Sequence, residues 1–580
     1  MRNPVYMALA GLLLLFASCQ KEISFIAPPA TGTSPITATV QGNIVDENGS
    51  PAPGVIIKVG SKTAITDAKG YFRIRNASLD KTTSLVTAEK AGYFKAFRVF
   101  AASKAVNQVK IKLLKKVLTG SVPSTGGGTI TLANGSSLQF NANCFARSGG
   151  AAYSGNVNVY AAFVDPTSPD IGETVPGSFL ADDKDNKRVI LTSYAMMAVE
   201  LETPAGEKLN IASGSTAKLN FSVPAGLQSS APASLSLWYV DETTGRWKEE
   251  GTAVKNGNIY TGEVKHFTYW NCDAPGPTVN CTATFVNQNG QPLIYTSVLI
   301  RPVAGYGCAH GFTDSLGQIS GPIPANMNLV LEIQAPYPCF SIVYSQNIGP
   351  FSADVNLGTI TVNTTQYLLT VEGKVVDCNN NPVSNGFAEI EYDNVVRYAS
   401  TNATGDFSIS FVDCGQGAPA CTIVGADSFA QQQGMPTIVT ITSPVTHAGN
   451  IIACGTSSIQ FMNYTIDGGS QVNLISTNPG DSFTASDTTA TQHRTYLSGY
   501  RSQNQHLSLD FDSPGTPGTY AIHYLSLDGY GQVTPLAACN LILTAFPQPG
   551  GFFEGTFSGQ FKDALNNTHS LNGSLRIKLR

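Results

Sequence analysis

The sequence predicts an all-β protein that consists of tandem β-sandwich domains. A length of 580 residues exceeds what one hydrophobic core serves, so about three to six domains are expected. The 56 glycines and 32 prolines imply many turns and few long helices. Apolar and polar residues alternate in short runs that stop at turn signals such as Asn48-Gly49, a pattern typical of half-buried strands.

The charge of the chain argues against partners that are attracted by a strong electrostatic field, such as nucleic acids. Only 13% of the residues are charged, and 40 acidic residues face 35 basic ones, which gives a net charge of −5. No stripe of Lys or Arg is present that could neutralise phosphates, so no binding of nucleic acid is expected. The apolar share of 42% argues against a long disordered chain.

Residues 1–18 have the layout of a secretion signal. Arg2 precedes the apolar run Met7–Ala17, which is too short for a membrane span of ~20 residues, and small residues lead to Cys19. The stretch Phe16-Ala17-Ser18-Cys19 resembles a bacterial lipoprotein signal, and the Ser-Cys-Gln-Lys-Glu that follows is similar to lipoproteins of the Bacteroidetes group. The resemblance implies that Cys19 is acylated and anchors the mature chain in the outer membrane, on its cell-surface or periplasmic face.

Two observations bear on this interpretation of the N-terminus. Phe16 stands where such signals usually have Leu, and an ordinary cleaved signal with an incidental Cys19 is the alternative. Residues 19–35 are rich in Pro and poor in charge from Ile26 onward, so they are expected to be an extended tether. The absence of CxxC pairs fits an oxidising compartment for the remaining cysteines.

The segment 36–116, called the first copy below, has the clearest strand and turn pattern. Its Asn48-Gly49 turn is followed by a second turn at Thr66-Asp67-Ala68-Lys69-Gly70 and by the strand Tyr71–Ile74. The patterns G-x-x-V-D-x-x-G-x-P and T-D-x-x-G-Y-F, with the later Gly92-Tyr93, resemble the carboxypeptidase regulatory-like domain. That resemblance implies a seven-stranded, prealbumin-like β-sandwich of about eighty residues, which is a non-catalytic domain.

The same signature recurs twice, which predicts a second copy at 279–364 and a third copy at 367–455. Pro51, Pro292 and Pro382 align across the copies. The later copies depart from the pattern, since Gln318-Ile319 replaces the aromatic pair and Asn402 replaces Asp.

Two further segments are expected to be β as well. The middle segment, 117–275, contains the Asp241–Gly245 turn and faintly resembles the paired sandwiches of cartilage intermediate layer protein. The C-terminal segment, 456–580, ends in a predicted hairpin that turns near Asn566-Asn567 and is similar to the ends of small Bacteroidetes lipoproteins.

No catalytic or metal motif emerges from the sequence. The seven histidines are scattered, and none has Glu within four residues downstream, so a zinc peptidase is not expected. The cluster Asp182-Asp183-Lys184-Asp185-Asn186 could bind Ca²⁺, but it lacks the Gly and the distal Glu of an EF-hand loop, and a solvated turn is favoured. No metal, no cofactor and no enzymatic activity are therefore expected.

Tryptophan and cysteine supply the remaining candidate residues. Trp247 and Trp270 could stack on a sugar, although packing in the core is the favoured interpretation. Spacing predicts disulfides between Cys414 and Cys421 across a turn-rich loop, between Cys378 and Cys454, and between Cys144 and Cys272. Cys281, Cys308, Cys339 and Cys539 are left unassigned.

The main functional hypothesis is a non-enzymatic, membrane-anchored lipoprotein of the cell envelope that serves adhesion, scaffolding or ligand presentation. The alternative is a carbohydrate-binding lipoprotein of a polysaccharide uptake system. The expected partners are the membrane, through the lipid anchor, and a glycan or protein ligand.

Overall fold

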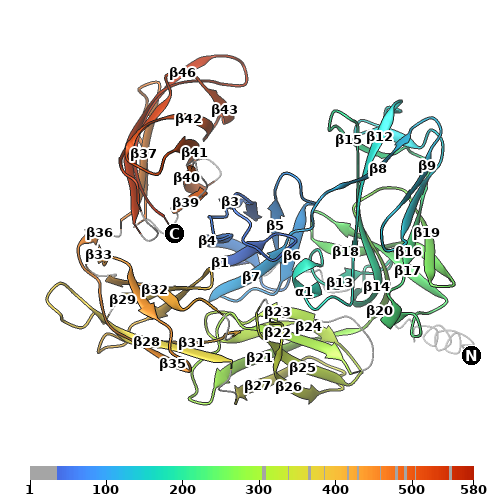
Figure 1. Ribbon diagram of the computed structural model, residues 1–580, viewed down its shortest axis with the longest axis horizontal. Helices are drawn as coiled ribbons and strands as arrows, with labels where there is room; N and C mark the ends of the chain where they lie inside the picture. Colours follow the sequence, from blue (N-terminus) through green and yellow to red (C-terminus); the bar gives the residue numbers. More distant parts are fainter. Residues whose placement is uncertain are drawn as a thin grey trace, which may run out of the picture. The chain divides into compact units, whose positions relative to one another are not determined.

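Strands make up nearly all of the regular structure in the computed structural model (Figure 1). The structure describes residues 35–579 apart from short gaps, which are 304–308, 337–338, 364–366, 385, 415–416, 428–429, 431, 458, 477–480, 489–492, 503–504 and 548–550. The prediction of an all-β fold class is confirmed. No helix in these described ranges is both long and apolar enough to cross a membrane.

The first copy is described without gaps and forms a seven-stranded, two-sheet sandwich, as the sequence predicts. One sheet has the order β4-β1-β7 and the other the order β3-β2-β5-β6, with β1 and β7 parallel. Alternate residues of the strands face a shared core that includes Val40, Ile44 and Phe72. Its strands are β1 (Pro35–Val45), β2 (Ile56–Val59), β3 (Lys62–Ile65), β4 (Tyr71–Asp80), β5 (Ser84–Glu89), β6 (Ala96–Phe100) and β7 (Val106–Lys112).

The second and third copies repeat this strand order. In the second copy the sheets run β24-β21-β27 and β23-β22-β25-β26. In the third copy they run β31-β28-β35 and β30-β29-β32-β33-β36, with β34 also paired to β32. The first strand of each later copy again pairs in parallel with a strand near the end of the copy, β21 with β27 and β28 with β35. The repeat inferred from the sequence signature is therefore a repeat of topology.

The bounds of these strands follow the chain order. The second copy has β21 (Thr278–Asn287), β22 (Ser297–Pro302), β23 (Ala309–Phe312), β24 (Gln318–Pro324), β25 (Leu329–Gln334), β26 (Ile342–Ile348) and β27 (Val355–Val362). The third copy has β28 (Leu368–Val376), β29 (Gly386–Tyr392), β30 (Val395–Ser400), β31 (Asp406–Val412), β32 (Ala420–Asp427), β33 (Gln432–Gln433), β34 (Thr437–Thr440), β35 (Val445–Ile452) and β36 (Thr456–Ser457).

A carboxylate or amide oxygen organises the turn after the first strand of each copy. Asp46 Oδ1 accepts hydrogen bonds from the backbone N–H groups of Asn48 and Ser50, at 2.8 and 2.9 Å. Asn287 and Asp377 do the same for the residues two and four positions further on. The aligned proline that follows then forms a β-bridge back to the strand, at Pro51, Pro292 and Pro382.

The second turn of the signature is held by Thr and Asp side chains in the same way. The hydroxyl of Thr66 donates to Ala52 O at 2.7 Å, and Asp67 Oδ1 accepts from the N–H groups of Lys69 and Tyr71. Thr313 and Asp314 repeat these contacts in the second copy. Gly70, Gly317 and Gly405 close the turns at φ near +70° to +80°, where a residue with a Cβ is strained.

The middle segment, also described without gaps, folds as a 13-stranded sheet with two hydrophobic cores. The longest strand, β14, pairs with β20 beside it in Figure 1. The elements are β8 (Leu118–Pro123), β9 (Gly128–Thr131), β10 (Ser137–Phe140), β11 (Phe145–Arg147), β12 (Asn156–Val164), α1 (Ile171–Thr174), β13 (Leu180–Asp182), β14 (Arg188–Glu202), β15 (Lys208–Ile211), β16 (Ala217–Ser222), the 3-10 turn Ala225–Leu227, β17 (Ser234–Asp241), β18 (Arg246–Asn256), β19 (Ile259–Val264) and β20 (Tyr269–Gly276).

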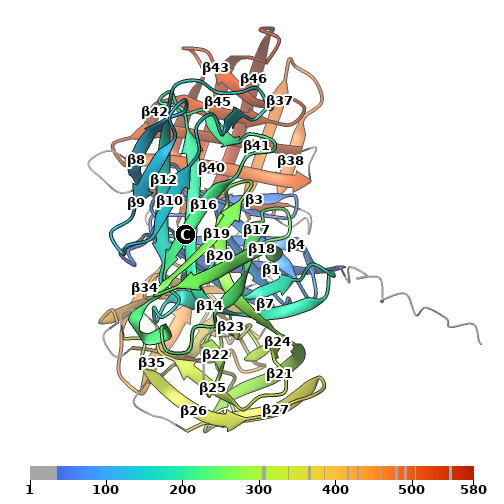
Figure 2. The same cartoon turned by 90° about the vertical axis from the view of Figure 1, so that its right-hand side faces the viewer.

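The described strands of the C-terminal segment join in one sheet around one core (Figure 2). The predicted terminal hairpin is present, with Asn566 at φ +68° in its turn. The strands are β37 (Phe461–Ile466), β38 (Val472–Ile475), β39 (Ser482–Thr488), β40 (His493–Ser502), β41 (Gln505–Ser513), β42 (Gly518–Leu527), β43 (Gly531–Pro535), β44 (Asn540–Ala545), β45 (Phe552–Lys562) and β46 (Thr568–Lys578).

Residues 35–580 form one compact unit, and buried polar side chains of the first copy connect it to the third. Gln41 and Asn43 lie on the face of β1 that points away from the first copy's core, yet both are buried. Gln41 Nε2 donates to Val396 O at 3.0 Å and Asn43 Nδ2 to Asn394 O at 2.6 Å. The Arg73 guanidinium lies 3.9 Å from the ring centroid of Tyr398.

Similar polar contacts connect the first copy to the middle segment and to the second copy. Lys110 and Lys112 form ion pairs with Glu173 and Asp170, at 3.1 and 2.7 Å. The Ser103 hydroxyl donates to Asp314 at 2.6 Å. The segments thus contact one another through specific hydrogen bonds and charges in addition to the linkers between them.

Replacing Gly70 should destabilise the first copy more than replacing Gly54. Both glycines have φ near +70°, but a Cβ at Gly70 would lie 2.2 Å from Ile44 O, whereas one at Gly54 has nothing within 4 Å. We expect Gly54→Ala to cost about 1 kcal/mol, from the backbone conformation alone. Gly70→Ala should cost about 3 kcal/mol because the backbone must also move. Hydrogen exchange of peptides from residues 36–116 in the full chain measures both, and equal loss of protection would contradict this account.

Candidate functional site

The predicted lipid attachment site, Cys19, lies outside the described residues, as does Cys308. The other candidate residues lie in described parts of the chain. The structure brings one predicted cysteine pair together, joins a third cysteine to an unexpected partner and buries both candidate tryptophans.

Among the described cysteines, two pairs form disulfides. Cys378, in the turn after β28, is bonded to Cys454, which follows β35, with the two Cα atoms 5.1 Å apart. This is the pairing that the sequence predicts, and it ties the first strand of the third copy to β35 near its end. Cys339 and Cys414 form the second pair, with Cα atoms 5.9 Å apart. This bond connects the second copy to the third.

The predicted bond between Cys414 and Cys421 is therefore wrong. Cys421 lies on β32, where the alternation of side chains directs it into the core of the third copy, and it is a free thiol with 2% exposure. Cys414 follows the end of β31 and lies beside Cys339 instead. The sequence left Cys339 unassigned because spacing within one copy carries no information on a bond between copies.

The predicted bond between Cys144 and Cys272 is also wrong. Both are free thiols, and both pack in the larger core of the middle segment. Cys272 lies within β20, which pairs with β14 along most of its length. Each of the two thiols serves there as a small apolar side chain, and burial raises the pKa of both.

Trp247 and Trp270 do not form a sugar-stacking surface. Each has 0% exposure, and their indole N–H groups donate to backbone carbonyls, at Ser178 O (2.8 Å) and His266 O (3.0 Å). The two rings belong to different cores of the middle segment. Core packing, the favoured interpretation in the sequence, is what the structure shows, and no exposed aromatic platform exists at these two positions.

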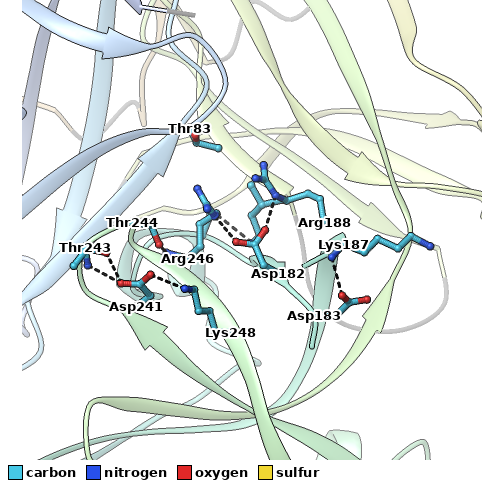
Figure 3. Close-up of polar contacts among 12 residues, drawn as sticks. Thr83, Asp182, Asp183, Lys187, Arg188, Asp241, Thr243, Thr244, Arg246 and Lys248 are labelled. Carbon is cyan, nitrogen blue, oxygen red and sulfur yellow. Dashed lines mark hydrogen bonds and ion pairs between the residues drawn. The ribbon is translucent and has the colours of Figure 1, made fainter. Parts of the chain in front are cut away.

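The acidic turn at 182–186 is built from ion pairs and backbone contacts (Figure 3). The buried Asp182 carboxylate accepts from Arg188 Nε at 2.9 Å and from Arg246 Nε at 2.8 Å. Asp183 Oδ1 accepts from the N–H groups of Asp185 and Lys187. Two guanidinium groups on Asp182 and backbone donors on Asp183 Oδ1 thus engage part of the oxygen set that a Ca²⁺ ion would need.

A second carboxylate in the same view, Asp241, closes the predicted turn between β17 and β18 (Figure 3). Burial opposes its ionisation, but hydrogen bonds from the hydroxyl and the N–H of Thr243 and the contact with Lys248 lower its pKa to about 2. No cluster of three or more His, Cys, Asp or Glu side chains suited to a metal occurs among the described residues.

The histidines occupy separate places, as their spacing suggests. His493 pairs with Asp487 at 2.6 Å, His447 with Glu372 at 2.8 Å and His569 with Asp467 at 2.7 Å. His310 differs from these, since its Nδ1 lies 3.1 Å from Gly172 O and its Nε2 lies 3.0 Å from the Ser297 hydroxyl. A carbonyl can only accept, so Nδ1 carries the proton and Nε2 accepts from Ser297.

Asp273 is a fully buried carboxyl that the sequence did not single out. It lies on β20 at 0% exposure; Oδ2 accepts from the amide of Asn271, and Oδ1 has no hydrogen-bond partner among the described residues. Burial raises its pKa well above the usual value, although contacts with Ser193, Tyr194 N–H and Asn271 act in the opposite direction. All residues of β20 from Tyr269 to Asp273 are buried, so alternation along this strand gives no signal for the burial of Asp273.

Comparisons with known proteins do not assign the chain to a family. No family model matches it, and no curated protein matches it. Among solved structures, it is similar to the shaft pilin SpaA from Lactobacillus rhamnosus GG, at 11% identity and a TM-score of 0.17 over 31% of this chain and 98% of that one. It is also similar to BcpA, the major pilin subunit of Bacillus cereus, at 9% identity and a TM-score of 0.13 over 73% and 100%. Similarities at this level identify neither a family nor a function.

Peptide mapping without reduction tests the cysteine assignments. We expect linked peptides for Cys378 with Cys454 and for Cys339 with Cys414. Cys144, Cys272, Cys281, Cys421 and Cys539 are buried free thiols and should react with an alkylating reagent only after denaturation. A linked peptide that joins Cys414 to Cys421, or rapid alkylation of Cys339 in the native chain, would contradict the structure.

The buried carboxyl of Asp273 should make the stability of the middle segment fall as the pH rises. The unfolded chain loses this proton near pH ~4, whereas the folded chain keeps it to a higher pH, so its contribution is complete below pH ~4 and is lost toward the raised pKa. Asp273→Asn replaces the ionisable carboxyl by an amide that stays neutral, so it should raise the melting temperature more at pH 8 than at pH 4. Tryptophan fluorescence during heating reports this, because the Trp238 indole donates to Asp273 O.

Asp241→Asn is the matched control with the opposite sign. The lowered pKa of Asp241 means that its carboxylate contributes stability above pH ~4 and loses that contribution as the pH falls toward about 2. This variant should be less stable than the parent at neutral pH, and the difference should shrink in acid. If both variants changed the melting temperature by the same amount at every pH, the assignment of Asp273 would be wrong.

Proposed function

We propose that this chain is a non-enzymatic lipoprotein of the cell envelope, anchored through Cys19 in the outer membrane, whose tandem sandwiches act as a scaffold for adhesion or for presenting a ligand. The observation that supports this most directly is the pair of disulfides in the second and third copies. Disulfides of this kind persist in oxidising compartments, as expected for a chain exported by the signal at residues 1–18.

The contacts between segments support the scaffold role. Buried hydrogen bonds join the first copy to the third, ion pairs join it to the middle segment, and a covalent bond joins the second copy to the third. Such contacts fix the position of one sandwich against the next, whereas domains joined by linkers alone move independently. A carbohydrate-binding role is not proposed, because the aromatic residues that suggested it are buried.

Replacing Cys19 tests the anchor. Because acylation needs the thiol of Cys19, Cys19→Ala should abolish labelling with an alkyne analogue of palmitate and release the protein from the membrane fraction. Cys281→Ala is the control, since it removes a buried thiol and should leave labelling unchanged. Continued labelling of Cys19→Ala would refute the lipoprotein assignment and leave an ordinary cleaved signal.

A further inference from the structure

The second copy shares a cavity with the first copy and the middle segment, at a position where the other two copies are filled by phenylalanine. In the first copy Phe72 is the cross-strand partner of Gly42, and in the third copy Phe407 is the partner of Gly373. Both rings are buried, and each touches the place where a Cβ of its glycine would lie, at 3.0 and 2.9 Å. In both copies the phenylalanine ring therefore occupies space that a side chain at the glycine position would need.

The second copy has a different pair at this register position. Ile319 on β24 is the partner of Ala283 on β21. Isoleucine is smaller than phenylalanine, and the methyl group of Ala283 occupies the space into which a ring would pack. Ile319 and Ala283 both line a cavity of about 630 Å³, which lies within the range of ~300–1,000 Å³ typical of small-molecule sites.

One part of the cavity wall is apolar and lies inside the second copy. Phe285, Val298, Ile300 and Leu331 line it from between the two sheets, and all four are buried. An alkyl chain bound there would be shielded from water on several sides, and each buried methylene would strengthen its binding. No polar side chain is needed to hold such a chain.

The rest of the wall comes largely from the first copy and the middle segment. It contains apolar residues such as Val99 and Phe179 together with polar ones, and its charged residues carry an excess of positive charge. The charged residues among the described lining are Lys81, Arg98, Lys104 and Asp314. Arg98 is buried with 7% exposure, and Lys81 and Lys104 are exposed. Asp314 accepts hydrogen bonds from the Ser103 hydroxyl and from two N–H groups of its own turn. In a chain with a net charge of −5, this local excess of cations favours an anionic group.

His310 contributes to the polar part without adding charge. It is held between Gly172 O and Ser297, and burial together with the nearby charge of Arg98 lowers its pKa to about 3. The ring is therefore neutral near pH 7, so Arg98 supplies the buried positive charge of the wall.

We propose that this cavity binds a single-chain amphiphile with a carboxylate head, of the class of long-chain fatty acids. The alkyl chain lies between the sheets of the second copy against Phe285 and Val298, and the carboxylate faces Arg98. A guanidinium recognises a carboxylate through charge and paired N–H donors, which a neutral head would not satisfy.

Fluorescence titration with 11-(dansylamino)undecanoate tests the proposal. The protein is the Cys19→Ala chain, prepared without detergent so that no other amphiphile competes. We expect saturable binding of one equivalent with increased dansyl emission, and at least tenfold weaker binding of the methyl ester of the same probe. Arg98→Gln should reduce the preference for the acid over the ester. Equal affinity for acid and ester would overturn the assignment of the head group.

A variant that fills the cavity can be based on the first and third copies, which show which residue pair fits at this position. Ala283→Gly with Ile319→Phe recreates the Gly–Phe pair of the first and third copies, and should weaken probe binding at least tenfold while raising the melting temperature. Ile423→Val, a comparable change in the core of the third copy away from the cavity, is the control and should retain binding. If the double variant folds and binds as before, the probe does not occupy this cavity and the proposal fails.

If vesicles of a two-chain phosphatidic acid displace the probe as well as oleate does, the single-chain assignment is wrong.

Discussion

The fold of each repeated sandwich depends on hydrogen bonds that backbone N–H groups of a turn donate to a side-chain oxygen. Asp46, Asn287 and Asp377 each accept from two backbone N–H groups immediately after the first strand. These turns fix where the chain leaves one sheet and enters the other, and the parallel pairing of the first strand with a strand near the end of each copy depends on that placement. The regular spacing of Asp or Asn, Gly and Pro in the sequence reflects the residues that these turns require.

The outer sheet face of the first copy shows why polar residues inside a protein need their partners. Gln41 and Asn43 would be ordinary solvent-facing residues in an isolated sandwich, but here they are buried against carbonyls of the third copy. A buried amide without a partner costs about 1–3 kcal/mol, so these groups favour one arrangement of the two copies over others. Apolar contacts alone are not directional and would allow the first copy to slide against the third.

The fold was predictable from the sequence to the extent that it rests on local signals. Turn residues and alternation identified the repeated copies and the terminal hairpin, and the cysteines at the two ends of the third copy gave one disulfide correctly. Cys339 and Cys414 are different, because their contact depends on how two copies meet, which no local pattern encodes. The pairing of Ile319 with Ala283 was visible only as a departure from the aromatic pattern, and its consequence became clear once the register was known.

The two disulfides are interleaved along the chain, since Cys378 lies between Cys339 and Cys414, and Cys414 lies between Cys378 and Cys454. A pulling force that enters before Cys339 and leaves after Cys454 can follow a covalent path of about 40 residues instead of about 115, which shortens the extension on unfolding by roughly 250 Å. Residues 339–378, 378–414 and 414–454 then connect the two crosslinks in parallel and share the load, so the third copy can be stretched no further than the shortest of these segments allows. A tether exposed to shear at a cell surface would gain from such a mechanical stop.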